Sequence, residues 1–246
     1  ATAANLSVAN TGTLVVGAHA NAAGTSASAA AGAVGVLQVA AATSENLSIV
    51  NSGTATVTAH AIASAVGPTG TATTATGTTG VGPASASAVA LRLGQIGVGA
   101  TTGAASVTNS GTLNVAARAT ANGTSANAFA SAIGVWQSVD PLPINFTNSG
   151  TLNVLAAANA VGSTGAATAT AKGYYGSAFG GGTETATVVN SGAMHVTAHA
   201  VAPGTAIAHA VGISVTNAPV TTAAGTPPVV TVNAQAMNGS ITNSGT

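Results

Sequence analysis

One nine-residue phrase recurs along the chain at nearly regular intervals, and this repeat constrains the fold more than any other feature. It reads ValAlaAsnThrGlyThrLeuValVal from Val8 and ValThrAsnSerGlyThrLeuAsnVal from Val107. Each copy is anchored on an asparagine, and the anchors are Asn10, Asn51, Asn109, Asn148, Asn190 and Asn243. They lie 41, 58, 39, 42 and 53 residues apart, which gives a unit of about 40 residues. A repeat of this length predicts stacked structural units, each burying its apolar face against its neighbours.

Within each unit, apolar residues occupy every second position after the anchor. Leu113, Val115, Ala117 and Ala119 follow Asn109 in this way, and a second alternating run begins later in each unit. A period of two predicts strands with one buried face, and no period of 3.6 supports a helix despite the high alanine content. We therefore predict an all-β fold: a β-solenoid of about five stacked coils, with two main strands per coil and a thin core of alanine and valine.

The spacing also predicts the organisation of the chain. We expect a single β-solenoid domain over residues 1–246, with repeats at 5–45, 46–105, 106–143, 144–185 and 186–237 and a partial sixth repeat at 238–246. Two units are longer than the others, and we assign their excess to loop insertions at 67–83 and 217–228.

Stacking places like residues on neighbouring rungs, so the six anchor asparagines are predicted to form a structural ladder of hydrogen-bonded amides. The AsnSerGly step should also form a turn, because asparagine tolerates the left-handed region and glycine brings no Cβ.

Charged residues are nearly absent from the chain, and this excludes several classes of protein. The 246 residues include three Lys or Arg, three Asp or Glu and no cysteine. Three cations are too few to neutralise a nucleic-acid backbone, so no nucleic-acid partner is expected. The lack of cysteine excludes a disulfide scaffold and a cysteine nucleophile.

Neither a membrane span nor a signal peptide is expected. The apolar stretch at 27–42 is too short to cross a bilayer as a helix, and we interpret it as a strand with its turn. The sequence shows no initiator methionine and no basic leader, which predicts a mature product or an internal segment.

The few acidic residues do not form a catalytic pattern. Glu45, Asp140 and Glu184 fall six to eight residues before an anchor, so they are expected in turns of different coils. Paired-carboxylate catalysis needs two carboxyl groups about 5 to 10 Å apart, which this placement does not provide. We predict no catalytic residue, no cofactor and no enzyme activity.

Histidine gives the one pattern that could suggest a metal. His19, His60, Arg118 and His199 each follow an anchor by nine residues and should form one outward column. Two imidazoles without a third ligand make a poor metal site, so we predict no metal and interpret the column as an exposed, tolerant position.

Two further sets of side chains offer alternatives to a purely structural role. Thr54, Thr56 and Thr58 form an outward row of the kind found on ice-binding solenoids, although the third and fourth units do not preserve it. The aromatic residues could be sugar platforms, but core or interface positions are favoured; they are Phe129, Trp136, Tyr174, Tyr175 and Phe179.

The phrase Val-Xxx-Asn-Ser-Gly-Thr-Leu-Xxx-Val resembles the repeats of secreted bacterial β-solenoid surface proteins, the autotransporter passengers and the filamentous-haemagglutinin-like adhesins. The resemblance covers the five units anchored on Asn10 to Asn190, and it differs in the longer unit and the loss of charge. It implies an extracellular or cell-surface, rod-like, adhesive or structural protein that meets other surface or matrix components. It brings no catalytic residue to this chain.

The expected function is mechanical: a self-assembling subunit of an extracellular fibre whose copies stack head to tail by strand addition. The predicted assembly edges are Asn5, Leu6 and Val8 at one end, with Ile241 and Asn243 at the other. Exposed edges normally carry charge or proline, and residues 1–8 carry neither. A non-polymerising segment of a large adhesin stalk is the first alternative, and an ice-binding solenoid is the second.

Overall fold

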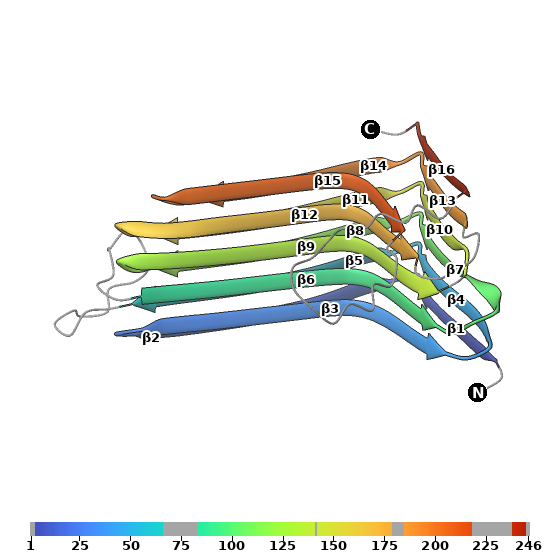
Figure 1. Cartoon of the computed structure of the whole chain (residues 1–246), viewed down its shortest axis with the longest axis horizontal. Coiled ribbons are helices and arrows are strands. Elements are labelled where there is room, and N and C mark those ends of the chain that lie inside the picture. The colour runs from blue at the N-terminus through green and yellow to red at the C-terminus, as the bar shows by residue number, and fades with distance from the viewer. Residues whose placement is uncertain (1–2, 66–82, 141, 179–184, 218–237, 245–246) are drawn as a thin grey trace, which may run out of the picture.

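Over the residues that it describes, the computed structural model is all-β and has sixteen strands (Figure 1). It describes residues 3–65, 83–140, 142–178, 185–217 and 238–244. Over these residues the chain forms no helix that could cross a membrane. The predicted insertions at 67–83 and 217–228 lie outside the described residues, apart from Pro83, which begins β6, and Asn217, which ends β15.

The strands form three parallel sheets in which neighbours come from successive coils. Sheet A comprises β1 (Ala4–Asn10), β4 (Ser44–Asn51), β7 (Thr102–Asn109), β10 (Ile144–Asn148), β13 (Thr185–Asn190) and β16 (Asn238–Asn243). Sheet B comprises β2 (Thr13–Gly24), β5 (Thr54–Ala65), β8 (Thr112–Asn122), β11 (Thr151–Val161) and β14 (Ala193–Val201). Sheet C comprises β3 (Ala27–Ala41), β6 (Pro83–Val98), β9 (Ser125–Asp140), β12 (Thr164–Ala178) and β15 (Thr205–Asn217).

Each coil passes through sheets A, B and C in turn before the chain rises to the next rung (Figure 1), which confirms the predicted β-solenoid. The two main strands expected per coil are those of sheets B and C. A third strand, in sheet A, precedes the anchor asparagine and corrects the expected number from two to three. It is only five to eight residues long. Its alternation therefore has few apolar members, such as Leu47 and Ile49 in β4, and is hard to recognise in the sequence.

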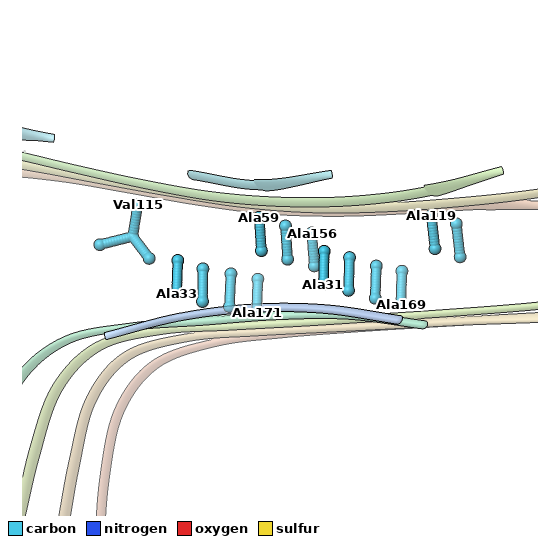
Figure 2. Packing of buried hydrophobic residues seen from close by; sticks show 14 of the residues in the cluster. Ala31, Ala33, Ala59, Val115, Ala119, Ala156, Ala169 and Ala171 are labelled. Carbon is cyan, nitrogen blue, oxygen red and sulfur yellow. The ribbon is translucent and has the colours of Figure 1, made fainter. Parts of the chain in front are cut away.

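The core between sheets B and C consists almost entirely of alanine. Figure 2 shows Ala59 and Ala156 of sheet B pointing toward Ala31 and Ala171 of sheet C across one thin layer. Toward its C-terminal ends, sheet C bends away from sheet B and faces sheet A (Figure 1). Larger side chains fill this wider part, including Leu47 and Ile144 at 1% and 0% exposure.

The turn from sheet A to sheet B continues the hydrogen-bonded stack around the corner. Gly53 N donates to Asn10 O at 3.0 Å, and Thr54 N donates to Gly12 O at 2.9 Å. No described residue other than glycine has a positive φ, so the expected left-handed asparagine is wrong. Glycine is needed here because the rungs lie so close together: a Cβ on Gly53 would overlap the carbonyl oxygen of Gly12 below it.

Candidate functional site

The anchor asparagines form a continuous column of side-chain amides along sheet A. Asn10 Nδ2 donates to Asn51 Oδ1 at 2.7 Å, and the same bond joins Asn51 to Asn109 at 2.8 Å. Asn109 donates to Asn148, and Asn148 to Asn190, each at 2.6 Å. The four upper asparagines are at most 2% exposed. Since stacked amides satisfy one another, this column ties the five coils together.

Four amides of the asparagine column, those of Asn10, Asn51, Asn109 and Asn148, donate toward the C-terminal end of the solenoid. The same nitrogens reach backbone carbonyls of the next coil, as in Asn10 Nδ2 to Thr54 O and Asn109 Nδ2 to Thr151 O, both at 3.3 Å. A carbonyl oxygen only accepts, so these contacts fix which side of each amide carries the nitrogen. At the lower end, no group in the described part of the chain donates to Asn10 Oδ1. At the upper end, Asn243 pairs with Asn190 in the backbone register, and its side chain lies outside the described residues.

A second amide column, which the sequence reasoning above does not identify, lies in the bent part of sheet C. Gln95 Nε2 donates to Gln38 Oε1 at 2.9 Å, and Gln137 Nε2 donates to Gln95 Oε1 at 2.8 Å. Gln38 Nε2 also donates to Ser48 O in sheet A at 3.0 Å, so the column links the two sheets. Its amides donate toward the N-terminal end, opposite to the asparagines. The signal was available, because Gln38 and Gln137 both follow their anchors by 28 residues.

Tyr174 ends the glutamine column. Gly176 takes the register position of Gln137 on the next rung, and Tyr174 Oη donates to Gln137 Oε1 at 2.8 Å. A Cβ on Gly176 would lie 2.7 Å from that hydroxyl oxygen, so the glycine makes room for the phenol. The Tyr174 ring stacks on Phe146 with centroids 4.7 Å apart. Burial raises the pKa of Tyr174 above its usual range, which keeps the hydroxyl protonated and able to donate.

The other aromatic residues lie away from this core position. Trp136 and Tyr175 are register neighbours in sheet C and are half-buried. Lys172 Nζ lies 4.2 Å from the centroid of the Tyr175 ring, a cation–π contact. Phe129 is 43% exposed on sheet C, and Phe179 lies outside the described residues. Of the expected core or interface positions, Tyr174 occupies the core, and an interface role for the exposed Phe129 stays a prediction.

Two charged residues are fully buried in the described part of the chain. Glu45 lies within β4 rather than in the expected turn, because the strand begins at Ser44; its Oε1 accepts from Ala42 N at 2.7 Å. Arg92 stands at the bend of sheet C, where the neighbouring coils have glycine. Its three guanidinium nitrogens have no hydrogen-bond partner, and burial lowers the pKa of Arg92 to about 10. Asp140 ends β9, and Glu184 lies outside the described residues.

The histidine column lies on the outer face of sheet B. His19, His60 and Arg118 are register neighbours on β2, β5 and β8, and Ala157 and His199 continue the column. The rings of His19 and His60 have centroids 5.0 Å apart and are nearly perpendicular, at 84°. Within the described ranges, no three His, Cys, Asp or Glu side chains gather as a metal site requires.

The threonine row is confined to one strand. Thr54, Thr56 and Thr58 lie on β5, and the last two are paired on β8 with Asn114 and Ala116. Only the first position continues across the sheet, as Thr13, Thr54, Thr112 and Thr151, so the row of three threonines is not repeated as a flat array.

Both ends of the solenoid present strands with a partner on one side only. β1, β2 and β3 form one end, and β14, β15 and β16 form the other. The predicted assembly edges belong to these strands: Asn5, Leu6 and Val8 to β1, and Ile241 and Asn243 to β16. Val8 is 36% exposed. Whether these edges bind another copy stays a prediction.

No protein-family model matches the chain, and neither the curated proteins nor the solved structures give a match.

Proposed function

We propose that the chain is a structural protein whose copies stack end to end into a fibre. The observation that carries this proposal is the open core at both ends. Leu113 and Leu152, in the inner coils, are 0% exposed, whereas Leu14 and Met194, at the two ends of the same column, are only partly buried. Solenoids that stay monomeric need polar caps, and no cap covers these ends within the described residues.

The asparagine column gives the contact a direction. A second copy placed below in the same orientation would bring the donating end of its column to Asn10 Oδ1, which has no donor among the described residues. A copy placed in the opposite orientation would bring acceptor against acceptor. Because these four amides donate the same way, the column favours head-to-tail growth, which gives an open filament.

Little charge opposes this contact. The six end strands contain no Lys, Arg, Asp, Glu or Pro, although such residues are the usual means of blocking an exposed edge. The formal net charge of the whole chain is zero, so long-range repulsion between copies is weak.

The three sheets differ in their number of strands, and this difference restricts how two copies can meet end to end at the contact between them, here called the seam. Sheet A has six strands, whereas sheets B and C have five. If β1 of an incoming copy lay on β16, sheets B and C would each lack one strand at the seam. A flush contact requires β1 of the incoming copy to replace β16 on β13. The two strands are similar in sequence: residues 5–10 read AsnLeuSerValAlaAsn and residues 238–243 read AsnGlySerIleThrAsn, which share both asparagines and the serine.

The resemblance of the repeat phrase to secreted adhesins and autotransporter passengers supports an extracellular location at the cell surface, in contact with other surface or matrix components. A non-polymerising stretch of adhesin stalk is the alternative. It would have the same fold, with its end coils covered by further covalent repeats.

The test compares the 246-residue chain with two variants one residue apart. Val16 faces the open core of the first coil, and Val15 faces solvent at 68% exposure. Val16→Lys leaves its ammonium in water in the monomer and would bury it at the seam, whereas Val15→Lys would leave it on the side of the fibre. Circular dichroism verifies the fold, and electron microscopy with sedimentation measures assembly.

We expect fibres from the parent chain and from Val15→Lys, with an axial repeat of about 24 Å from five rungs of about 4.8 Å each. Val16→Lys should stay monomeric. Monomeric rods from the parent chain at all concentrations would overturn the proposal in favour of the stalk. Equal assembly of both variants would show that the copies do not meet through their ends.

A further inference from the structure

A column of basic side chains crosses the outer face of sheet B and takes no part in the core or in the proposed stacking. His19, His60 and Arg118 stand in register on β2, β5 and β8, so neighbours lie one rung, about 4.8 Å, apart. His19 and Arg118 are exposed, and His60 is half-buried. In a chain with only three Lys or Arg, this column concentrates a substantial share of the hydrogen-bond donors that can carry positive charge.

Small side chains beside the column leave a hollow in the sheet. The adjoining outward column holds Gly17, Thr58 and Ala116 on the same three strands. A shallow depression of about 390 Å³ is lined by these residues and by His19, His60 and Arg118. The donors thus border a space that a small group can enter from solvent.

No acid balances these donors in the described part of the chain. Glu45 is the only carboxylate whose side chain is described, and it is buried against Gly97 of β6. His60 is faced by His19 from β2 and by Arg118 from β8, and by no other described titratable group. Burial, then His19, then Arg118 lower the pKa of His60. Protonation of His60 is therefore disfavoured by its neighbours, and a bound anion would offset this effect.

We propose that His19, His60 and Arg118 bind an oxyanion: a carboxylate, sulfate or phosphate group. The guanidinium supplies a permanent charge and a planar fork of donors, which suits such groups. The imidazoles supply further N–H donors, and Thr58 adds a hydroxyl at the side of the depression. A metal is disfavoured because the third neighbour of the two perpendicular rings is a guanidinium, which is no ligand and repels cations.

The ligand can be a free ion or one group of an acidic polymer lying along the column, since the recognising chemistry is the same. In either case the bound anion favours the protonated imidazoles. Affinity should therefore rise as the pH falls below the usual range of histidine titration. The column lies on the side of the solenoid, so the inference is independent of end-to-end assembly.

The test is equilibrium dialysis of the full 246-residue chain against radiolabelled sulfate, with fluorescent dextran sulfate as the polymeric probe. Dialysis works for monomers and fibres alike. Two pairs of variants isolate the column: Arg118→Gln is compared with Lys172→Gln, and His60→Asn is compared with the same change at the exposed His209 of β15, in sheet C. In each pair, the first variant changes a residue of the column and the second makes the same kind of change outside the column, as a control. Measurements at pH 5.5 and pH 8, at equal ionic strength, test the histidine dependence.

We expect Arg118→Gln to weaken binding about tenfold, the effect of losing one charged hydrogen bond, and Lys172→Gln to leave it unchanged. His60→Asn should remove most of the gain in affinity at pH 5.5, and His209→Asn should not. Binding of free sulfate identifies a single-ion site, and binding of dextran sulfate alone identifies a polymer site; both support the proposal. Equal weakening within each pair, or no binding of either probe, would overturn it.

Discussion

The asparagine column makes a quantitative prediction about stability. Asn109→Ala removes the central amide, which is 0% exposed. Asn148 Oδ1 then loses the 2.6 Å donor that satisfies it, and an unsatisfied buried acceptor costs about 1–3 kcal/mol. Asn51 Nδ2 loses its 2.8 Å acceptor but keeps Gly53 O at 3.1 Å, which limits that loss to about 1 kcal/mol. We expect the free energy of unfolding to fall by about 2–4 kcal/mol.

The assay is urea unfolding followed by far-ultraviolet circular dichroism, with the slope m compared between variants so that a shifted midpoint can be interpreted as a change in stability. Asn114→Ala is the matched control, because Asn114 Oδ1 also accepts an amide bond, from Asn153 at 2.8 Å, on the half-exposed outer face of sheet B. Water can replace that bond, so we expect a loss below about 1 kcal/mol. Equal losses in the two variants would refute the claim that the buried column stabilises the stack.

The pH dependence of Asn109→Asp extends this test. The carboxylate can still accept from Asn51, but it faces Asn148 Oδ1, to which the asparagine donated. Burial beside another oxygen raises the pKa of this carboxyl in the folded state above its unfolded value of about 3.9. The folded variant then binds more protons than the unfolded one between these two pKa values, so its stability falls as the pH rises through that range. At low pH the protonated acid can donate a hydrogen bond, so the free energy of unfolding of the variant should approach that of the parent chain. A loss of stability that does not change with pH would contradict this account.

Three further substitutions test other close contacts. Gly150→Ala should lower the free energy of unfolding by about 3 kcal/mol or more, because the new Cβ would overlap backbone of the rung below. Gly32→Ala is the control: a Cβ there meets open space, so the same urea assay should show no loss of stability. Tyr174→Phe should lose about 1–2 kcal/mol with the hydroxyl that donates to the glutamine column, and the half-buried Tyr175→Phe should change the midpoint little. Arg92→Met should raise the free energy of unfolding by about 1–3 kcal/mol, because it removes a buried, unpartnered cation; a lower midpoint in calorimetry would show that the guanidinium has a role in the core.

The sequence predicts the β-solenoid well because every rung needs apolar residues at the same inward positions. Alternation after each anchor identifies the inward positions, and Leu113, Ala117 and Ala156 are buried as this period requires. The apolar positions follow each anchor at the same offsets, which likewise predicts the register, since a slip of one residue would turn every alanine outward. Regularity of this kind is visible in a single chain.

Features that break the repeat are not predicted in the same way. Tyr174 looks like an ordinary strand aromatic until the register shows that it reaches across to Gln137 past Gly176. Arg92 lies at the register position where neighbouring coils have glycine, but the long insertion before it changes its distance from the anchor. Its position at the bend therefore cannot be predicted from the spacing in the sequence. Such residues depend on contacts between coils, which the alternation of one strand does not encode.

The two amide columns differ in how they end, and this difference bears on growth. The glutamine column is closed at its upper end by the Tyr174 hydroxyl, which donates to Gln137 and occupies the place of a further amide. The asparagine column runs from the first coil to Asn190, and Asn10 Oδ1 at its lower end has no donor among the described residues. Asn10 is half-buried at the open end, so water can bind its Oδ1 in the monomer, and an amide of an incoming copy that replaced this water would add about 1 kcal/mol at every seam. Specificity for head-to-tail stacking should therefore reside in sheet A, and replacing Asn10 should impair assembly more than replacing Gln38.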